Sequence, residues 1–202
     1  MAMQEIKGLG GSLPTAEPTT RTGPAFGRII TERATEFLAI VRVVVGLEFL
    51  WAFLDKTFGL GYATPAARAW INRGSPTKGF LSNVAVGPFE STFHAWAGAP
   101  WADWLFMAGL LGIGIALIAG IGLRIAAVSG TLMLLGMWAA EWPLAKFTSA
   151  GEPSMSTNPI VDYHIIYALA LIALALTYAG HTWGLGRLWA KLLFVQRHRW
   201  LI

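Results

Sequence analysis

Ionisable side chains interrupt an apolar stretch at residues 37–58 and are the first candidates for chemistry. Arg42 and Glu48 stand inside this run, and Asp55 and Lys56 stand at its far end. At about 100° per residue, Glu48 and Asp55 lie only ~20° apart around a helix. An ionisable group at membrane depth costs at least ~2.5 kcal/mol, so we expect each to face the bundle interior with a partner. Glu48 and Asp55 are candidate proton carriers with Arg42 as their partner; the alternative is a salt bridge that only fixes helix packing.

Histidines supply the second set of candidates. Asp162, Tyr163 and His164 begin the last long apolar stretch, and His94 lies in the first long connection. Histidine exchanges protons near neutral pH, which suits a proton-transfer site. Ligand types at Glu141, Asp162 and His164 are compatible with a metal, but their spacing does not require one, and no metal site is predicted. We predict that one cavity is lined by Glu48, Asp55, Trp51, His94, Asp162 and His164.

The composition indicates the class of protein that must position these groups. The chain has 202 residues, of which 55% are hydrophobic and only 13% are charged. Soluble domains carry about a quarter charged residues, so the shortage of charge predicts an integral membrane protein of one domain. No cysteine is present, which excludes disulfides and thiolate or persulfide chemistry on this chain. The net charge of +4 comes largely from the ends, which indicates membrane topology rather than nucleic-acid binding.

Apolar runs predict an all-α membrane protein with a bundle of four transmembrane helices. The spans are expected at about 37–58, 101–123, 125–142 and 160–179, within a membrane domain covering 25–183. In the second span Ala108, Gly112, Ala116 and Gly120 recur every fourth residue, which favours close helix packing. Residues 1–24 are expected to be a disordered cytoplasmic tail. Residues 184–202 are expected to be a basic amphipathic tail on the membrane interface.

The connection from Gly59 to Pro100 is long and rich in aromatic residues. Loops of this length usually carry structure or function, and short helices are expected near 65–71 and 90–96. We interpret the connection as an extracytoplasmic cap over one end of the bundle; a loop that only plugs the bundle is the alternative. Lys and Arg are more numerous on the opposite side, so both termini are predicted to be cytoplasmic.

Several motifs carry a resemblance to a known family. Arg42, Gly46-Leu47 and Lys56 in the first span, with Gly120-Ile121-Gly122-Leu123-Arg124, resemble the DoxX family of four-helix membrane proteins. The chain is more specifically similar to the DoxD-type branch, described as the membrane subunit of thiosulfate:quinone oxidoreductase. Its matching segments are 70–71, 74–81, 87–89, 158–164 and 184–187, and the likeness covers roughly residues 35 to 190.

The resemblance implies a quinone as cofactor and a bacterial or archaeal plasma membrane as location. A quinone site needs an apolar cleft with aromatic walls and polar donors near the carbonyls. Trp51, Trp138 and Trp142 are the expected walls. The expected donors are His94, His164 and Tyr163, and Arg42 is also expected to bind the cofactor. The chain carries no haem, flavin or nucleotide motif. Fixed cations would attract an anionic sulfur substrate, and the first loop supplies Arg68, Arg73 and Lys78 for this role.

Three functions remain open from the sequence. The first is a quinone-linked oxidoreductase subunit, and the second is a membrane anchor or scaffold for a redox or sulfur-transfer partner. The third is a small-solute carrier with a polar site in the membrane, although no inverted repeat is visible. The expected partners are the lipid bilayer, an extracytoplasmic partner subunit and further copies of the chain in a homo-oligomer.

Overall fold

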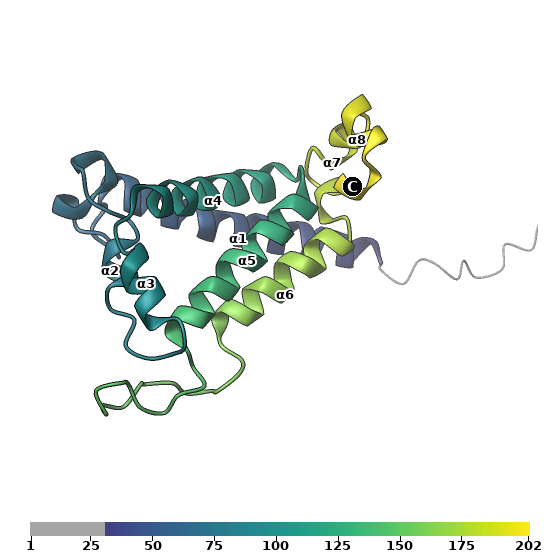
Figure 1. Ribbon diagram of the computed structural model, residues 1–202. Helices are drawn as coiled ribbons and strands as arrows, with labels where there is room; N and C mark the ends of the chain where they lie inside the picture. The colour runs from purple at the N-terminus through teal and green to yellow at the C-terminus, as the bar shows by residue number, and fades with distance from the viewer. Residues whose placement is uncertain (1–30) are drawn as a thin grey trace, which may run out of the picture. The chain divides into compact units, whose positions relative to one another are not determined.

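A computed structural model describes residues 31–202, and this part of the chain is helical (Figure 1). Its longer helices are α1 (Glu32–Phe58), α4 (Pro100–Ala119), α5 (Leu123–Glu141) and α6 (Tyr163–Leu176). Its short helical segments are η1 (Ala66–Arg68), η2 (Trp70–Asn72), α2 (Lys78–Leu81), α3 (Glu90–Trp96), η3 (Ala179–His181), α7 (Gly186–Trp189), α8 (Leu193–Arg197) and η4 (Arg199–Leu201). The tail expected at 1–24 lies outside the described residues.

Three of the helices, α1, α4 and α5, are long and apolar enough to cross a membrane. The expected fourth span at 160–179 contains α6, which has 14 helical residues and is apolar but shorter. At about 1.5 Å per residue, α6 by itself covers roughly 21 Å. The structure therefore agrees with an all-helical membrane protein and shows three helices of spanning length among the described residues.

The long helices pack chiefly in two pairs, α1 with α4 and α5 with α6. Figure 1 shows α4 and α5 diverging from the short turn that joins them. All four contribute to one buried apolar core, including Phe49 of α1, Leu117 of α4, Leu134 of α5 and Leu171 of α6. The two pairs are thus joined by a common core near the turn and separate away from it.

Glycines allow the close approach of α1 and α4, but they are not the expected ones. A Cβ added at Gly46 would lie 2.9 Å from Leu117 Cβ, and one at Gly114 would lie 2.9 Å from the backbone nitrogen of Leu50. Gly112 has nothing within 4 Å of such a Cβ. The prediction that Gly112 marks the packing face was wrong, because four-residue spacing identifies a helix face without identifying what covers it.

Arg42 is completely buried, as a charged residue in a span should be, but no carboxylate among residues 31–202 pairs with it. Its Nη1 donates to the carbonyls of Leu117 and Ile118 (2.8 Å to Ile118) at the end of α4. Its Nη2 donates to the Trp183 carbonyl at 3.0 Å. The predicted pairing of Arg42 with Glu48 or Asp55 was wrong. Carbonyls at a helix C-terminus lack intrahelical donors and carry partial negative charge, which suits a cation.

The first long connection is anchored to the helices by two buried carboxylates. Asp55 accepts hydrogen bonds from the backbone N–H groups of Tyr62 (3.3 Å) and Ala63 (3.1 Å). Asp103, in the first turn of α4, accepts from the Thr77 N–H at 3.0 Å and from the hydroxyls of Ser75 and Thr77 at 2.8 and 2.6 Å. Each carboxylate accepts hydrogen bonds from loop groups that would otherwise bind water, so the loop is held in a defined position.

Residues 184–202 form short helical segments instead of one continuous amphipathic helix. Trp189 Nε1 donates to the Leu201 carbonyl at 3.0 Å, and Arg124 Nη1 donates to the Trp200 carbonyl at 3.3 Å. Leu201 is buried. The tail therefore folds back on itself and onto the start of α5, and its expected place at the membrane interface stays a prediction.

Candidate ligand-binding cleft

An apolar cleft of about 500 Å³ lies between α4 and α5, where the two helices diverge. From α4 it is lined by residues that include Trp101, Leu105 and Phe106, and from α5 by Leu132, Met133 and Gly136. Loop residues of the first connection close one end: Pro76, Thr77, Phe80, Leu81, Phe93 and Trp96. The cleft therefore lies between two helices that are long and apolar enough to cross a membrane.

Aromatic rings form a continuous wall at the loop end of the cleft. Phe93 and Trp96 meet edge to face with ring centroids 5.8 Å apart, and Trp96 meets Trp101 in the same way at 5.3 Å. Phe93 is buried against Val84 and Ala140 in a second apolar cluster. Edge-to-face contacts hold rings in preferred orientations, so the wall is preorganised for a flat apolar ligand.

Few polar groups reach the cleft. Lys56 lies at its border, with Nζ 5.9 Å from the centroid of the Phe106 ring. Thr77 and Ser129 are the hydroxyl residues in the lining. The Thr77 hydroxyl donates to Asp103 and the Ser129 hydroxyl to the Ile125 carbonyl at 2.8 Å. The Lys56 ammonium is therefore the strongest donor available to a carbonyl oxygen placed in the cleft.

A broad basin of about 850 Å³ adjoins the cleft on the side of the first connection. Lys56, Pro76 and Phe80 line both cavities. The charged residues of the basin are all cations, namely Lys56, Arg68, Arg73 and Lys78, and no carboxylate belongs to its lining. The three loop cations singled out from the sequence therefore do share one concave surface, and this surface lies beside the apolar cleft.

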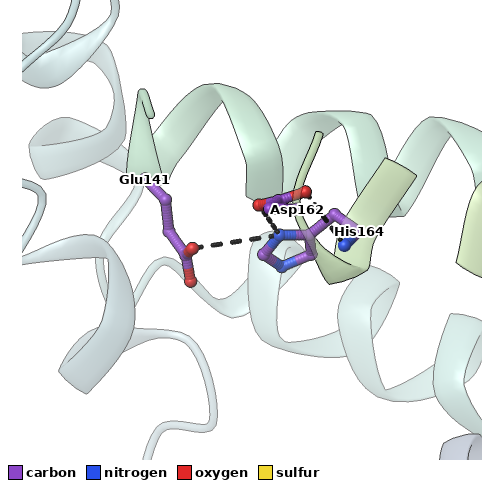
Figure 2. A group of neighbouring side chains, drawn as sticks. All are labelled: Glu141, Asp162 and His164. Atoms are coloured by element: carbon purple, nitrogen blue, oxygen red, sulfur yellow. Dashed lines mark hydrogen bonds and ion pairs between the residues drawn. The ribbon is translucent and has the colours of Figure 1, made fainter. Parts of the chain in front are cut away.

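The acidic and histidine residues at the α5–α6 junction form a separate cluster (Figure 2). His164 is fully buried, and its Nδ1 lies 2.8 Å from Asp162 Oδ2 and 3.9 Å from Glu141 Oε2. Asp162 Oδ1 also accepts from the N–H groups of His164 and Ile165, so Asp162 is the N-cap of α6. Capping satisfies N–H groups that a helix leaves free at its start.

Two neighbours complete the junction. The Tyr163 hydroxyl donates to Glu141 Oε1 at 2.8 Å, and Trp138 Nε1 donates to the Ile160 carbonyl at 3.1 Å. Both hydrogen bonds tie the end of α5 to the segment that begins α6. The positions of Tyr163 and Trp138 are accounted for by this junction, and neither residue lines the cleft or the basin.

The ligand atoms of Glu141, Asp162 and His164 lie within 4.8 Å of one another, which is compatible with a cation. A metal-bound histidine ordinarily donates its other ring N–H to an acceptor. His164 Nε2 is buried and has no hydrogen-bond partner. The residues present therefore fit a resident metal poorly, and helix capping accounts for the cluster.

The structure does not bring the six predicted cavity residues together. Glu48 is exposed on the outer face of α1, and Trp51 is 44% exposed on the same helix. Asp55 is buried and occupied by its two backbone N–H groups. His94 is exposed, with Nε2 2.8 Å from the Val84 carbonyl. Asp162 and His164 share a side-chain hydrogen bond, but no cavity found in the described residues is lined by the six together, so the prediction of a single cavity was wrong.

Sequence reasoning missed Asp103 and the cleft wall. An acidic residue in the first turn of a helix is ordinary, because it favours the positive end of the helix dipole, so Asp103 gave no distinctive signal. The first connection was recognised as rich in aromatic residues, and the helix expected at 90–96 coincides with α3. The packing of Phe93 with Ala140 of α5 is tertiary, and no local pattern contains it.

The chain matches no family model, no curated protein and no solved structure.

Proposed function

We propose that this chain is the quinone-reactive membrane subunit of an oxidoreductase, with the quinone in the α4–α5 cleft. The observation that carries the proposal is the cleft itself: about 500 Å³, lined almost wholly by apolar side chains, with a single ammonium group at its border. A quinone is a flat apolar ring with two carbonyl acceptors. The wall of Phe93, Trp96 and Trp101 suits the ring, and Lys56 is placed to donate to a carbonyl.

The proposal assigns four membrane spans, α1, α4, α5 and α6, with the first connection outside and both termini in the cytoplasm of a bacterium or archaeon. The outward loops then stand over the end of the bundle where the cleft meets Lys56. Flanking residues such as Ile160 and Val161 extend the apolar length of the short α6. A short span is accommodated by local thinning of the bilayer at modest cost.

The reaction class follows from the resemblance to the DoxD-type branch. Two thiosulfate anions that join through a new S–S bond release two electrons. A quinone that takes up these two electrons and two protons becomes a quinol, which balances the exchange. The chain contains no cysteine, so no cysteine persulfide of its own carries the sulfur. We place the sulfur chemistry on an extracytoplasmic partner subunit and the quinone on this chain.

Filling the cleft tests the proposal. Gly136 lines the cleft, and an added Cβ there meets nothing within 4 Å, so Gly136→Phe should fill the cleft without disturbing helix packing. Gly112→Phe is the matched control, because Gly112 is equally open and does not line the cleft. We expect Gly136→Phe to weaken binding of a short-chain ubiquinone analogue at least tenfold, measured by quenching of tryptophan fluorescence. Equal affinities in the two variants would show that the quinone is not in this cleft.

A second candidate function, a membrane anchor for a partner protein, is favoured by the position of Glu48. Glu48 is exposed on α1 near the middle of a span, where a carboxyl facing lipid is costly. A partner helix that offers a hydrogen-bond donor at this depth would remove the cost. Single-cysteine variants at Val44 and Leu47, made in this cysteine-free chain, should then cross-link to the partner or to a second copy. Absence of cross-links in native membranes would count against the anchor.

The carrier hypothesis loses its main support, because Arg42 is bound to backbone carbonyls and Glu48 does not face it.

A further inference from the structure

The basin beside the cleft carries a concentration of positive charge, and no carboxylate belongs to its lining. Arg68, Arg73 and Lys78 are exposed. Their side chains make no hydrogen bond or ion pair to a residue that the structure describes. Like charges gathered in a concave surface raise the local concentration of anions.

These cations stand on an ordered part of the loop. Asp103 fixes Ser75 and Thr77 on one side of the basin, and Asp55 fixes the turn at 62–63 on the other. Between them, Asn72 Nδ2 donates to the Ala66 carbonyl at 2.8 Å. The fold therefore fixes the loop backbone that carries these cations.

The basin also lies directly beside an apolar space. Lys56, Pro76 and Phe80 belong to the lining of both cavities, so a ligand that passes over these three side chains would reach from the cations into the α4–α5 cleft. A small free oxyanion would use only part of a basin of about 850 Å³ and none of the cleft. An amphiphile with a large anionic head would use both.

We infer that the basin and the cleft together form a binding site for an anionic phospholipid, with its phosphate among the basin cations and an acyl chain in the cleft. Trp96 and Trp101 line the loop end of the cleft, and tryptophan favours the level of the lipid headgroups. A cleft open to the bilayer is filled by hydrocarbon whenever no other ligand occupies it. This inference goes beyond the proposed function and does not rest on a quinone being bound.

The test compares lipids of different charge on the full-length protein. Purified protein in phosphatidylcholine nanodiscs would be titrated with phosphatidylglycerol, and bound lipid counted by native mass spectrometry. The triple variant Arg68→Gln, Arg73→Gln, Lys78→Gln removes three basin charges. Each nearby Lys or Arg is worth a factor of about five in affinity for an anionic lipid, so we expect a loss of at least tenfold.

A matched variant removes the same charge elsewhere. Lys146, Arg187 and Lys191 are exposed and do not line either cavity, so Lys146→Gln, Arg187→Gln, Lys191→Gln should bind the lipid as the wild type does. Thermal unfolding of both variants checks that they are folded. Equal lipid affinity of the two triple variants, or equal binding of phosphatidylglycerol and phosphatidylcholine, would overturn the inference.

Two further measurements distinguish a bound lipid from a free anion. Gly136→Phe should weaken phosphatidylglycerol binding, because the phenyl ring would occupy the space of the acyl chain, whereas binding of a free oxyanion should be unaffected. If thiosulfate or inorganic phosphate binds in a way that depends on the basin and the lipid does not, the site belongs to a free anion and the inference fails. Quinone binding measured in pure phosphatidylcholine tests the proposed function separately, so each can fail without the other.

Discussion

Replacing Arg42 should destabilise the protein strongly, and removing an acid should not rescue it. The guanidinium donates to the carbonyls of Leu117, Ile118 and Trp183, and it thereby joins the end of α4 to the segment after η3. A hydrogen bond from a charged group contributes about 1.5 kcal/mol or somewhat more to stability in water. In a membrane the contribution is smaller, because polar groups of the unfolded, membrane-inserted state also find hydrogen-bond partners. Three bonds at ~1 kcal/mol each predict that Arg42→Met lowers the free energy of unfolding by about 3 kcal/mol.

The assay is reversible unfolding in mixed detergent micelles, followed by circular dichroism. Arg42→Lys should fall between the wild type and Arg42→Met, because an ammonium keeps the charge but cannot bridge carbonyls on two segments. Glu48→Gln and Asp55→Asn should each add their own cost to Arg42→Met and recover none of it. A loss under ~1 kcal/mol for Arg42→Met would refute the carbonyl-binding role. Recovery in either double variant would show that Arg42 is paired with an acid after all.

Other expectations follow from the same contacts. Gly114→Ala should cost about 1–3 kcal/mol in the unfolding assay, because its Cβ would meet the α1 backbone, whereas Gly112→Ala should be neutral or gain up to about 1 kcal/mol in helix propensity. Asp103→Ala should cost about 3 kcal/mol and increase proteolysis of the first connection, since three hydrogen bonds are lost; unchanged proteolysis would contradict its anchoring role. Asp162→Ala should cost at least about 1 kcal/mol through loss of the α6 N-cap, and a neutral result would remove that role. A cysteine at the exposed Ser82 should react with an impermeant thiol reagent from outside only, and labelling from the cytoplasm would reverse the proposed orientation.

Composition and local pattern were sufficient for the class of protein and for most helices. Low charge and long apolar runs predicted an all-helical membrane protein, and α1, α4 and α5 fall within a few residues of the expected spans except at the start of α1 and the end of α4. The helix at 90–96 was also expected from sequence. Such features depend on hydrophobicity and on contacts along the chain, which the order of residues contains directly.

The partners of the polar residues were decided only by the tertiary structure. Helical periodicity placed Glu48 and Asp55 on nearly the same side of α1, yet Glu48 is exposed. Asp55 is buried and accepts hydrogen bonds from the loop residues Tyr62 and Ala63. Arg42 was expected to need a carboxylate, but the free carbonyls at the end of α4 satisfy a cation equally well. Backbone acceptors do not appear in a sequence as distinct letters, so their use as ligands cannot be read from it.

The cleft has the same origin. Its wall combines α4, α5, Lys56 of α1 and two separate parts of the first connection, and it lies where α4 and α5 diverge from a short turn. The sequence determined that the chain has apolar helices, a loop rich in aromatic residues and a group of loop cations. Only packing decided that the aromatic residues and the cations border adjoining cavities, because distances between residues far apart in the chain depend on how the helices cross and separate.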